Sequence, residues 1–297
     1  MHLFKNANFQ FINKRKGGYV FSSILIIISV VSLVIHGGPK YNIDFTGGSL
    51  VHLKFDKDVA IQDIRALLSK EGFTDAEIKH FGSNKEVSIR IGVDQTRDSL
   101  STIIEKGIHE ALPDNPFVEQ RNETVGPKIG KELIVDALLA IFWSMVLILI
   151  YVMWRFELKF SVGAILALMH DTIITLGIFS IFEIEISAPV IAAVLTIIGY
   201  SLNDTIVVFD RIRENLKASS KNISDISGIV NESINQTLSR TIITAGTTLI
   251  VVVILFFFGG EVLRTFALAL IIGIGIGTYS SIFIASPIVI DWKTKKA

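Results

Sequence analysis

The chain has 297 residues, of which 50% are hydrophobic, and its 28 basic side chains balance its 28 acidic ones. A disordered chain would be less hydrophobic, and a soluble domain would carry about a quarter charged residues where this chain has 19%. The zero net charge provides no basic field for nucleic acid, and the lack of cysteine excludes disulfides, zinc–thiolate sites and a thiol nucleophile. With a mean hydropathy of +0.55, the composition predicts a membrane protein.

The hydrophobic residues are concentrated in six long stretches. A helix of about 20 residues crosses the roughly 30 Å hydrocarbon layer of a bilayer, and each stretch approaches or exceeds that length. Two stretches are interrupted by the polar pairs His170-Asp171 and Asn203-Asp204. The predicted transmembrane helices are 18–36, 133–154, 159–182, 186–209, 241–260 and 264–290.

The first stretch follows a basic cluster, Lys14-Arg15-Lys16, as the core of a signal peptide would. Its apolar run is longer than the usual core of about 7 to 15 residues, and residues 34–38 offer no small-x-small cleavage pattern. The sequence therefore predicts an uncleaved membrane anchor.

Basic residues gather on alternate connections, which sets the predicted orientation. The positive-inside rule places these connections in the cytoplasm, together with both termini. The predicted cytoplasmic segments are an N-terminal segment 1–17, a loop 210–240 and a tail 291–297. The basic residues of the later connections are Arg155, Lys159, Arg211, Arg213, Lys217, Lys221, Lys293, Lys295 and Lys296.

Residues 37–132 lie between the first two stretches and predict one folded domain on the outer, periplasmic face. Its patterns predict strands at 50–55, 77–81, 87–91 and 117–125, with helices over 59–70, capped by Asp58, and 96–112. The order β-α-β-β-α-β suggests a small α+β domain of the ferredoxin-like type. His52, His80 and His109 are scattered among these elements, which favours surface or half-buried histidines over a metal site.

Two carboxylates interrupt the predicted membrane helices. A central aspartate costs about 2.5 to 3.5 kcal/mol on insertion scales, so such residues normally face a protein interior or a water path. Asp171 sits about midway along the third helix, and Asp204 lies in the cytoplasmic half of the fourth. Tyr200 and Ser201 share the helix face of Asp204, and Asn203 is beside it. These residues predict a proton-binding path, and the alternative for Asp171 is that His170 or a hydroxyl group simply satisfies its carboxylate.

The fifth helix carries a matching polar stripe of Arg240, Thr244, Thr247 and Thr248. An arginine could bias the charge of a carboxylate that binds and releases a proton, and hydroxyls could hold water. The alternative for the threonines is that they bond back to their own helix and only pack.

Glycine spacing in the last stretch has a simpler explanation. Gly273, Gly277 and Ser281 recur every fourth residue, which allows close helix approach. Because they lie in an apolar span without a preceding strand, they do not predict a phosphate loop. The sequence predicts no cofactor, no metal ion and no catalytic residue.

The order of several motifs resembles the SecF family of bacterial protein-export subunits over essentially the full length. The most specific match is Ile198-Gly199-Tyr200-Ser201-Leu202-Asn203-Asp204-Thr205-Ile206-Val207-Val208-Phe209-Asp210-Arg211-Ile212-Arg213-Glu214-Asn215. The other matches are Asp44-Phe45-Thr46-Gly47-Gly48, Val125-Gly126-Pro127-Lys128-Ile129-Gly130, Arg155-Phe156, His170-Asp171, Leu238-Ser239-Arg240-Thr241 and Gly277-Thr278-Tyr279-Ser280-Ser281. One departure is Ala245, where the family pattern leads us to expect serine.

The resemblance implies a non-enzymatic subunit of the bacterial inner membrane that pairs with SecD. It implies further partners in the channel formed by SecY, SecE and SecG, in YajC and in the unfolded preprotein. The family's proton-path aspartate matches Asp204, and its arginine matches Arg240. The remaining predicted path residues are Tyr200, Ser201, Asn203, Thr244, Thr247 and Asp171.

Our hypothesis for the mechanism is that protonation of Asp204 weakens its attraction to Arg240, and that the helices repack enough to tilt the outer domain. One alternative is a half-transporter of the resistance-nodulation-division type that exports a small hydrophobic compound or lipid. Another is a structural clamp, in which Asp204 and Arg240 form a fixed ion pair.

Overall fold

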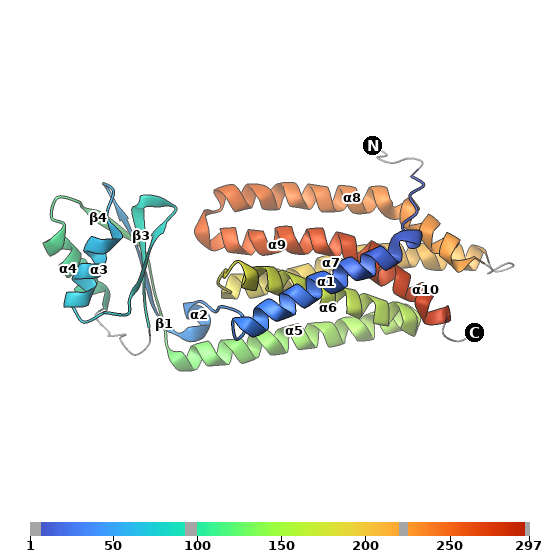
Figure 1. Ribbon diagram of the computed structural model, residues 1–297, viewed down its shortest axis with the longest axis horizontal. Coiled ribbons are helices and arrows are strands. Elements are labelled where there is room, and N and C mark those ends of the chain that lie inside the picture. Colours follow the sequence, from blue (N-terminus) through green and yellow to red (C-terminus); the bar gives the residue numbers. More distant parts are fainter. Residues whose placement is uncertain (1–6, 93–99, 220–224, 295–297) are drawn as a thin grey trace. The chain divides into compact units, whose positions relative to one another are not determined.

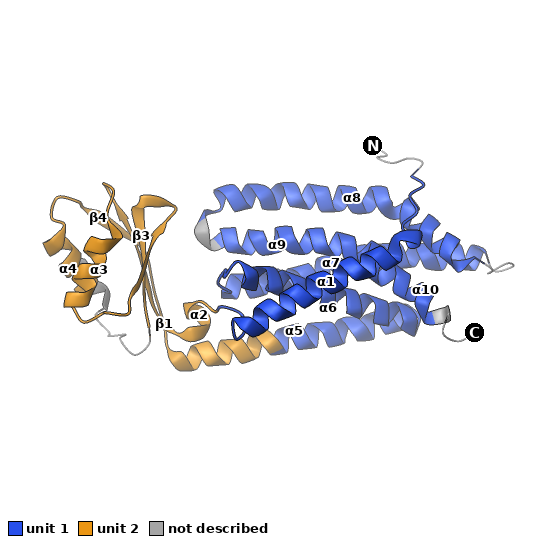
Figure 2. Ribbon diagram, in the orientation of Figure 1, with its two compact units in different colours: residues 1–40, 139–297 blue, residues 41–138 orange. Residues whose placement is uncertain are grey.

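The computed structural model describes residues 7–92, 100–219 and 225–294. The chain forms two compact units, one of residues 1–40 with 139–297 and one of residues 41–138 (Figure 2). Each unit has its own hydrophobic core. Parts of the predicted segments 1–17, 96–112, 210–240 and 291–297 lie outside the described residues.

The first unit is a bundle of long helices (Figure 1). Among the described residues, 6 helices are long and apolar enough to cross a membrane, in agreement with the prediction from the sequence. A short helix η1, Ile12–Lys14, precedes the first of them, and the sixth combines three consecutive elements. The spanning helices are α1 (Arg15–Ile35), α5 (Pro127–Arg155), α6 (Leu158–Ile181), α7 (Ala188–Ala218), α8 (Ile226–Phe258), and α9 (Gly260–Ser280) with the π-helix η3 (Ser281–Ala285) and α10 (Ser286–Thr294).

Burial along α1 is inverted relative to a helix of a soluble protein. The buried residues of α1 are Gly18, Ser22, Ser29 and Ser32, whereas many of its large aliphatic side chains are exposed. Lipid is a good solvent for aliphatic side chains, so small and polar residues are free to face other helices. The most buried spanning helix is α6, which packs against α1, α7 and α9.

Most of the described residues in the predicted cytoplasmic connection 210–240 are helical. Helix α7 continues to Ala218, and α8 already begins at Ile226. The Asp225 side chain caps α8 by accepting a 2.8 Å hydrogen bond from the backbone N–H of Gly228. Hydropathy reports where a helix leaves the apolar layer, and the polar sequence beyond it still favours helix.

The second unit is a four-stranded antiparallel sheet with two helices. Its strands follow the order β2-β3-β1-β4, and each neighbouring pair is antiparallel. Alternate residues of β1 enter the core, where they meet α3 and α4 on one face of the sheet (Figure 1). The elements are α2 (Ile43–Thr46), β1 (Gly48–Phe55), α3 (Ile61–Lys70), β2 (Glu77–Phe81), β3 (Ser83–Ile91), α4 (Leu100–Ala111) and β4 (Phe117–Val125).

The predicted cap at Asp58 is wrong. Helix α3 begins at Ile61, after Ala60, and no side chain caps it. The backbone N–H of Val59 bonds instead to the carbonyl of Asn84, in the β3 strand. This link to the hairpin holds residues 58 and 59 outside the helix.

His52 is buried on the sheet, with 6% of its surface exposed, and its ring lies 4.1 Å from that of Phe81. Burial lowers the pKa of His52, and the positive charge of Arg121 lowers it further, while Glu123 and Glu86 act in the opposite direction. The neutral imidazole is therefore the form that suits this site.

Candidate functional site

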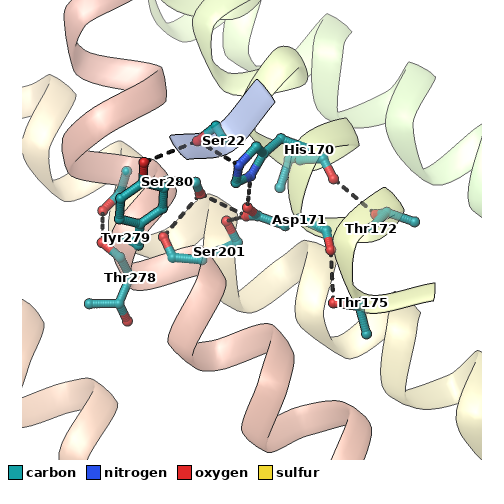
Figure 3. Close-up of polar contacts among 12 residues, drawn as sticks. Ser22, His170, Asp171, Thr172, Thr175, Ser201, Thr278, Tyr279 and Ser280 are labelled. Carbon is teal, nitrogen blue, oxygen red and sulfur yellow. Dashed lines mark hydrogen bonds and ion pairs between the residues drawn. The ribbon is translucent and has the colours of Figure 1, made fainter. Parts of the chain in front are cut away.

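Asp171 lies at the centre of a polar cluster between four helices (Figure 3). Its side chain is 1% exposed and takes part in three hydrogen bonds. Ser201 of α7 donates to Oδ2 at 2.6 Å, and Ser280 of α9 donates to the same oxygen at 2.8 Å. The Nδ1 atom of His170 lies 2.8 Å from Oδ1. Both oxygens of this buried carboxylate thus have hydrogen-bond partners.

A glycine on α9 makes this convergence possible. A Cβ atom at Gly277 would lie 3.0 Å from Cβ of Ser201 and 3.5 Å from Oδ2 of Asp171. The absence of that atom brings α9 close enough to α7 and α6 for Ser280 to reach the carboxylate. The glycine spacing seen in the sequence therefore serves packing directly beside the cluster.

His170 continues the cluster toward α1. Its Nε2 atom lies 3.0 Å from Oγ of Ser22, which in turn lies 3.1 Å from the hydroxyl of Tyr279 on α9. The Tyr279 hydroxyl donates a 2.8 Å hydrogen bond to the carbonyl of Gly18. A series of bonds thus connects α6, α1 and α9.

The contact between α1 and α6 keeps one register. An offset of 148 residues separates Ser22 from His170 and again separates Ser32 from Ser180, whose hydroxyls lie 2.9 Å apart. The same offset relates Ser29 to Gly177, where an added Cβ atom would collide with Ser29. The two helices therefore run parallel, with a seam of small polar residues between them.

Asp204 is buried without such support. It is 2% exposed, and in the described part of the chain its Oδ2 atom has no hydrogen-bond partner. The hydroxyls of Thr205 beside it and of Thr241 on α8 are also buried and unpaired. The guanidinium of Arg240 attracts the carboxylate, but the two groups form no ion pair within 4.0 Å. An unpaired buried carboxylate is costly, and such groups are typical of functional sites.

The other residues of the predicted proton path do not form hydrogen bonds with the carboxylate of Asp204 in the described part of the chain. Ser201 contacts Asp171 rather than Asp204. Tyr200 donates a long, 3.5 Å hydrogen bond to Thr248, and Asn203 is exposed. Thr244 and Thr247 donate to carbonyls of their own helix, at 2.8 Å to Arg240 and 2.9 Å to Ile243. The threonine stripe therefore follows the packing alternative in its hydrogen bonding.

The sequence interpretation did not assign roles to Ser22, Tyr279 and Ser280. A signal for the first was present, because the buried serines of α1 are spaced by seven and then three residues, as on one face of a helix. A polar face on an apolar membrane helix indicates contact with another helix. The motif that contains Tyr279 and Ser280 was recognised, but its spacing alone does not identify Asp171 as a partner.

The fold and the site define a multi-pass membrane protein with ionisable groups buried between its helices. The family profile described as "Protein export membrane protein SecD/SecF, C-terminal" matches residues 107–295. The chain is 47% identical over 290 residues to the protein translocase subunit SecF of Desulfurispirillum indicum, covering 96% of this chain and 92% of the relative. It is also 47% identical over 294 residues to that of Calditerrivibrio nitroreducens, with 97% and 96% covered. The chain belongs to the SecF family.

A solved structure has the same fold over this length. The crystal structure of SecDF, a translocon-associated membrane protein from Thermus thermophilus, matches with a TM-score of 0.87 and 38% identity. The match covers 99% of this chain and 40% of that chain. A SecDF structure in the super-membrane-facing form matches with a TM-score of 0.70.

Proposed function

We propose that this chain is the SecF subunit of a complex with SecD that assists Sec-dependent export of unfolded preproteins, and that it is not an enzyme. Its relatives are named protein translocase subunits, and it corresponds to only 40% of a SecDF chain, which leaves a second part for SecD. The channel of SecY, SecE and SecG, together with YajC, completes the proposed set of partners.

The proposed location is the bacterial inner membrane, with both termini in the cytoplasm and residues 37–132 in the periplasm. The basic connections support this orientation. For the periplasmic unit we propose the ferredoxin-like class, because the element order β-α-β-β-α-β is combined with the all-antiparallel order β2-β3-β1-β4.

We propose that export is driven by protons that cross the membrane by binding to and leaving Asp204. The observation that carries this proposal is the buried Oδ2 atom without a partner, because a proton or a water molecule there would relieve the cost of burial. Arg240 attracts the ionised form, so its charge competes with the proton. The proposed path also contains Tyr200, Ser201, Asn203, Thr244, Thr247 and Asp171.

The available energy suits a conformational step. One proton that crosses the membrane releases about 2.3 kcal/mol per 100 mV, which is comparable to allosteric couplings of about 1 to 3 kcal/mol. In the proposed cycle, protonation of Asp204 weakens its attraction to Arg240, the helices repack, and the periplasmic unit moves with the preprotein.

Export in inner-membrane vesicles tests this function. The variant Asp204→Asn cannot release a proton, so preprotein translocation driven by an imposed proton gradient should fall to the level without a gradient. Asp136→Asn is the matched control, since the same change is made at an exposed site of α5. Native gradient-driven export by Asp204→Asn would refute the proposal, and unchanged export with lost efflux of a small compound would favour the half-transporter.

A further inference from the structure

Three hydrogen bonds in series fix the positions of their hydrogens when each hydrogen is given to a single acceptor. The bonds connect His170 to Ser22, Ser22 to Tyr279, and Tyr279 to the carbonyl of Gly18. A carbonyl only accepts, so Tyr279 gives its single hydrogen to Gly18. Ser22 must then donate to the Tyr279 oxygen.

With its one hydrogen committed to Tyr279, Ser22 can only accept from His170. The Nε2 atom of His170 therefore carries a hydrogen and donates it to Ser22. The bond between Nδ1 of His170 and Oδ1 of Asp171 needs another hydrogen. A neutral imidazole has one N–H and a carboxylate has none, so all four bonds exist together only when the pair holds one extra proton.

We infer that His170 and Asp171 form a proton-binding site that is separate from Asp204. A proton bound at this site completes the hydrogen bonds that join α1 to α6 and α9. The bound proton lies on Nδ1, giving imidazolium and carboxylate, or on Oδ1, giving neutral imidazole and carboxylic acid. Either form keeps the hydrogen on Nε2. When the proton leaves, the remaining hydrogens fill only three of the four bonds.

The surroundings of the pair supply hydroxyls rather than charges. Helix α7 presents Ser201, α9 presents Ser280 and Tyr279, and α1 presents Ser22. Within the described ranges, no lysine, arginine or glutamate forms an ion pair or hydrogen bond with either member. Occupancy by the proton is therefore governed by the four bonds and not by a fixed counter-ion.

When the proton leaves, the hydrogen bond that is lost determines which helix contact is weakened. Helix α1 is joined to α9 at this depth through Ser22, Tyr279 and Gly18. Loss of one of these bonds loosens α1 while Ser32 and Ser180 still join it to α6 further along the seam. Ser201 lies one turn from Asp204 on α7, so the two sites share a helix. The consequence for export rests on the proposed function, whereas the protonation state does not.

The test is nuclear magnetic resonance of the full-length chain, labelled with ¹⁵N-histidine, in lipid bilayers at neutral pH. His170→Gln assigns the resonance, and infrared spectra of wild type and Asp171→Asn assign the carboxyl band. We expect either a doubly protonated ring with an ionised Asp171 or an Nε2–H ring with a protonated Asp171. A ring without hydrogen on Nε2, or an Nε2–H ring beside an ionised Asp171, would overturn the inference.

Tyr279→Phe provides the decisive variant, because its ring keeps the contacts with Phe21 and Phe283. Without the hydroxyl, Ser22 can donate to Nε2, and the pair no longer needs the extra proton. The ratio of proton-bound to proton-free pairs should fall about tenfold. Ser29→Ala, in the same seam but outside this series of bonds, should leave the ratio unchanged.

Equal ratios in wild type and Tyr279→Phe would overturn the inference, as would an equal fall in Ser29→Ala. These spectra need neither a proton gradient nor a preprotein. If these spectra show no extra proton on His170 and Asp171, the proposed role of Asp204 in export is unaffected. If the Asp204→Asn export test fails, the inferred proton on His170 and Asp171 is unaffected.

Discussion

Asp171 and Asp204 are buried to nearly the same extent, with 1% and 2% of their surfaces exposed, yet their surroundings are opposite. Asp171 accepts hydrogen bonds from Ser201 and Ser280 and shares a third with His170. Oδ2 of Asp204 accepts none from the described residues. The bundle thus stabilises one carboxylate and carries the cost of the other, which is the pattern expected when stability is given up for function.

The same substitution should therefore change stability in opposite directions at the two sites. Asp204→Asn removes an unpaired charge and should raise the free energy of unfolding by about 1 kcal/mol or more. Asp171→Asn removes charge-assisted hydrogen bonds and should lower it by about 1 to 3 kcal/mol. Thermal unfolding of the purified chain in one detergent measures both. Shifts of the same sign would show that the two environments do not differ as described.

Packing along the seam predicts a strong effect at Gly177. A methyl group there would collide with Ser29, so Gly177→Ala should destabilise the bundle by about 1 to 3 kcal/mol. Adding Ser29→Gly should restore only part of the loss, because it removes the colliding side chain but leaves Cα of Ser29 2.7 Å from the added Cβ atom. The matched control is Gly246→Ala on α8, where a Cβ atom meets nothing within 4 Å. That change should be neutral or stabilising by up to about 1 kcal/mol. A Gly177→Ala variant as stable as the wild type, or a double variant less stable than Gly177→Ala alone, would contradict this contact.

The seam also shows how far the sequence could predict this site. Hydropathy located the six membrane helices, and alternation located the four strands, because both patterns are local. Helical spacing places Ser201 on the same face as Asp204, but Ser201 donates to Asp171. Spacing within one helix gives a shared face and not the neighbour that the face meets. That neighbour depends on the close approach of α9 at Gly277 and on the register between α1 and α6.

Acid should loosen the α+β unit through His52. Burial holds the folded-state pKa of His52 below its ordinary value of about 6.5, so the unfolded chain binds a proton more readily. The contribution of His52 to the free energy of unfolding is fully present above about pH 6.5. It decreases as the pH drops through that value toward the pKa of the folded state. Hydrogen exchange at Val51 and Leu53, corrected for intrinsic rates, should accelerate between pH 7 and pH 5.

The contribution of His52 is isolated by comparing two variants. His52→Gln cannot titrate, so its exchange rates should depend less on pH in this window. His80→Gln, at an exposed position of β2, should retain the dependence of the wild type. An identical pH profile in all three proteins would rule out His52 as the cause.

Two asparagines of α8 bind the segment that precedes α1, and each protects a different backbone amide. Asn235 accepts from the N–H of Phe9 at 2.9 Å, and Asn231 accepts from the N–H of Ile12 at 3.2 Å. Asn235→Ala should therefore speed hydrogen exchange at Phe9 by roughly threefold to tenfold, with less effect at Ile12. Asn231→Ala should do the reverse, and Gln236→Ala, at an exposed neighbouring position, should change neither. Equal acceleration of both amides in each asparagine variant would mean that the segment detaches as one piece and that the individual bonds do not act separately.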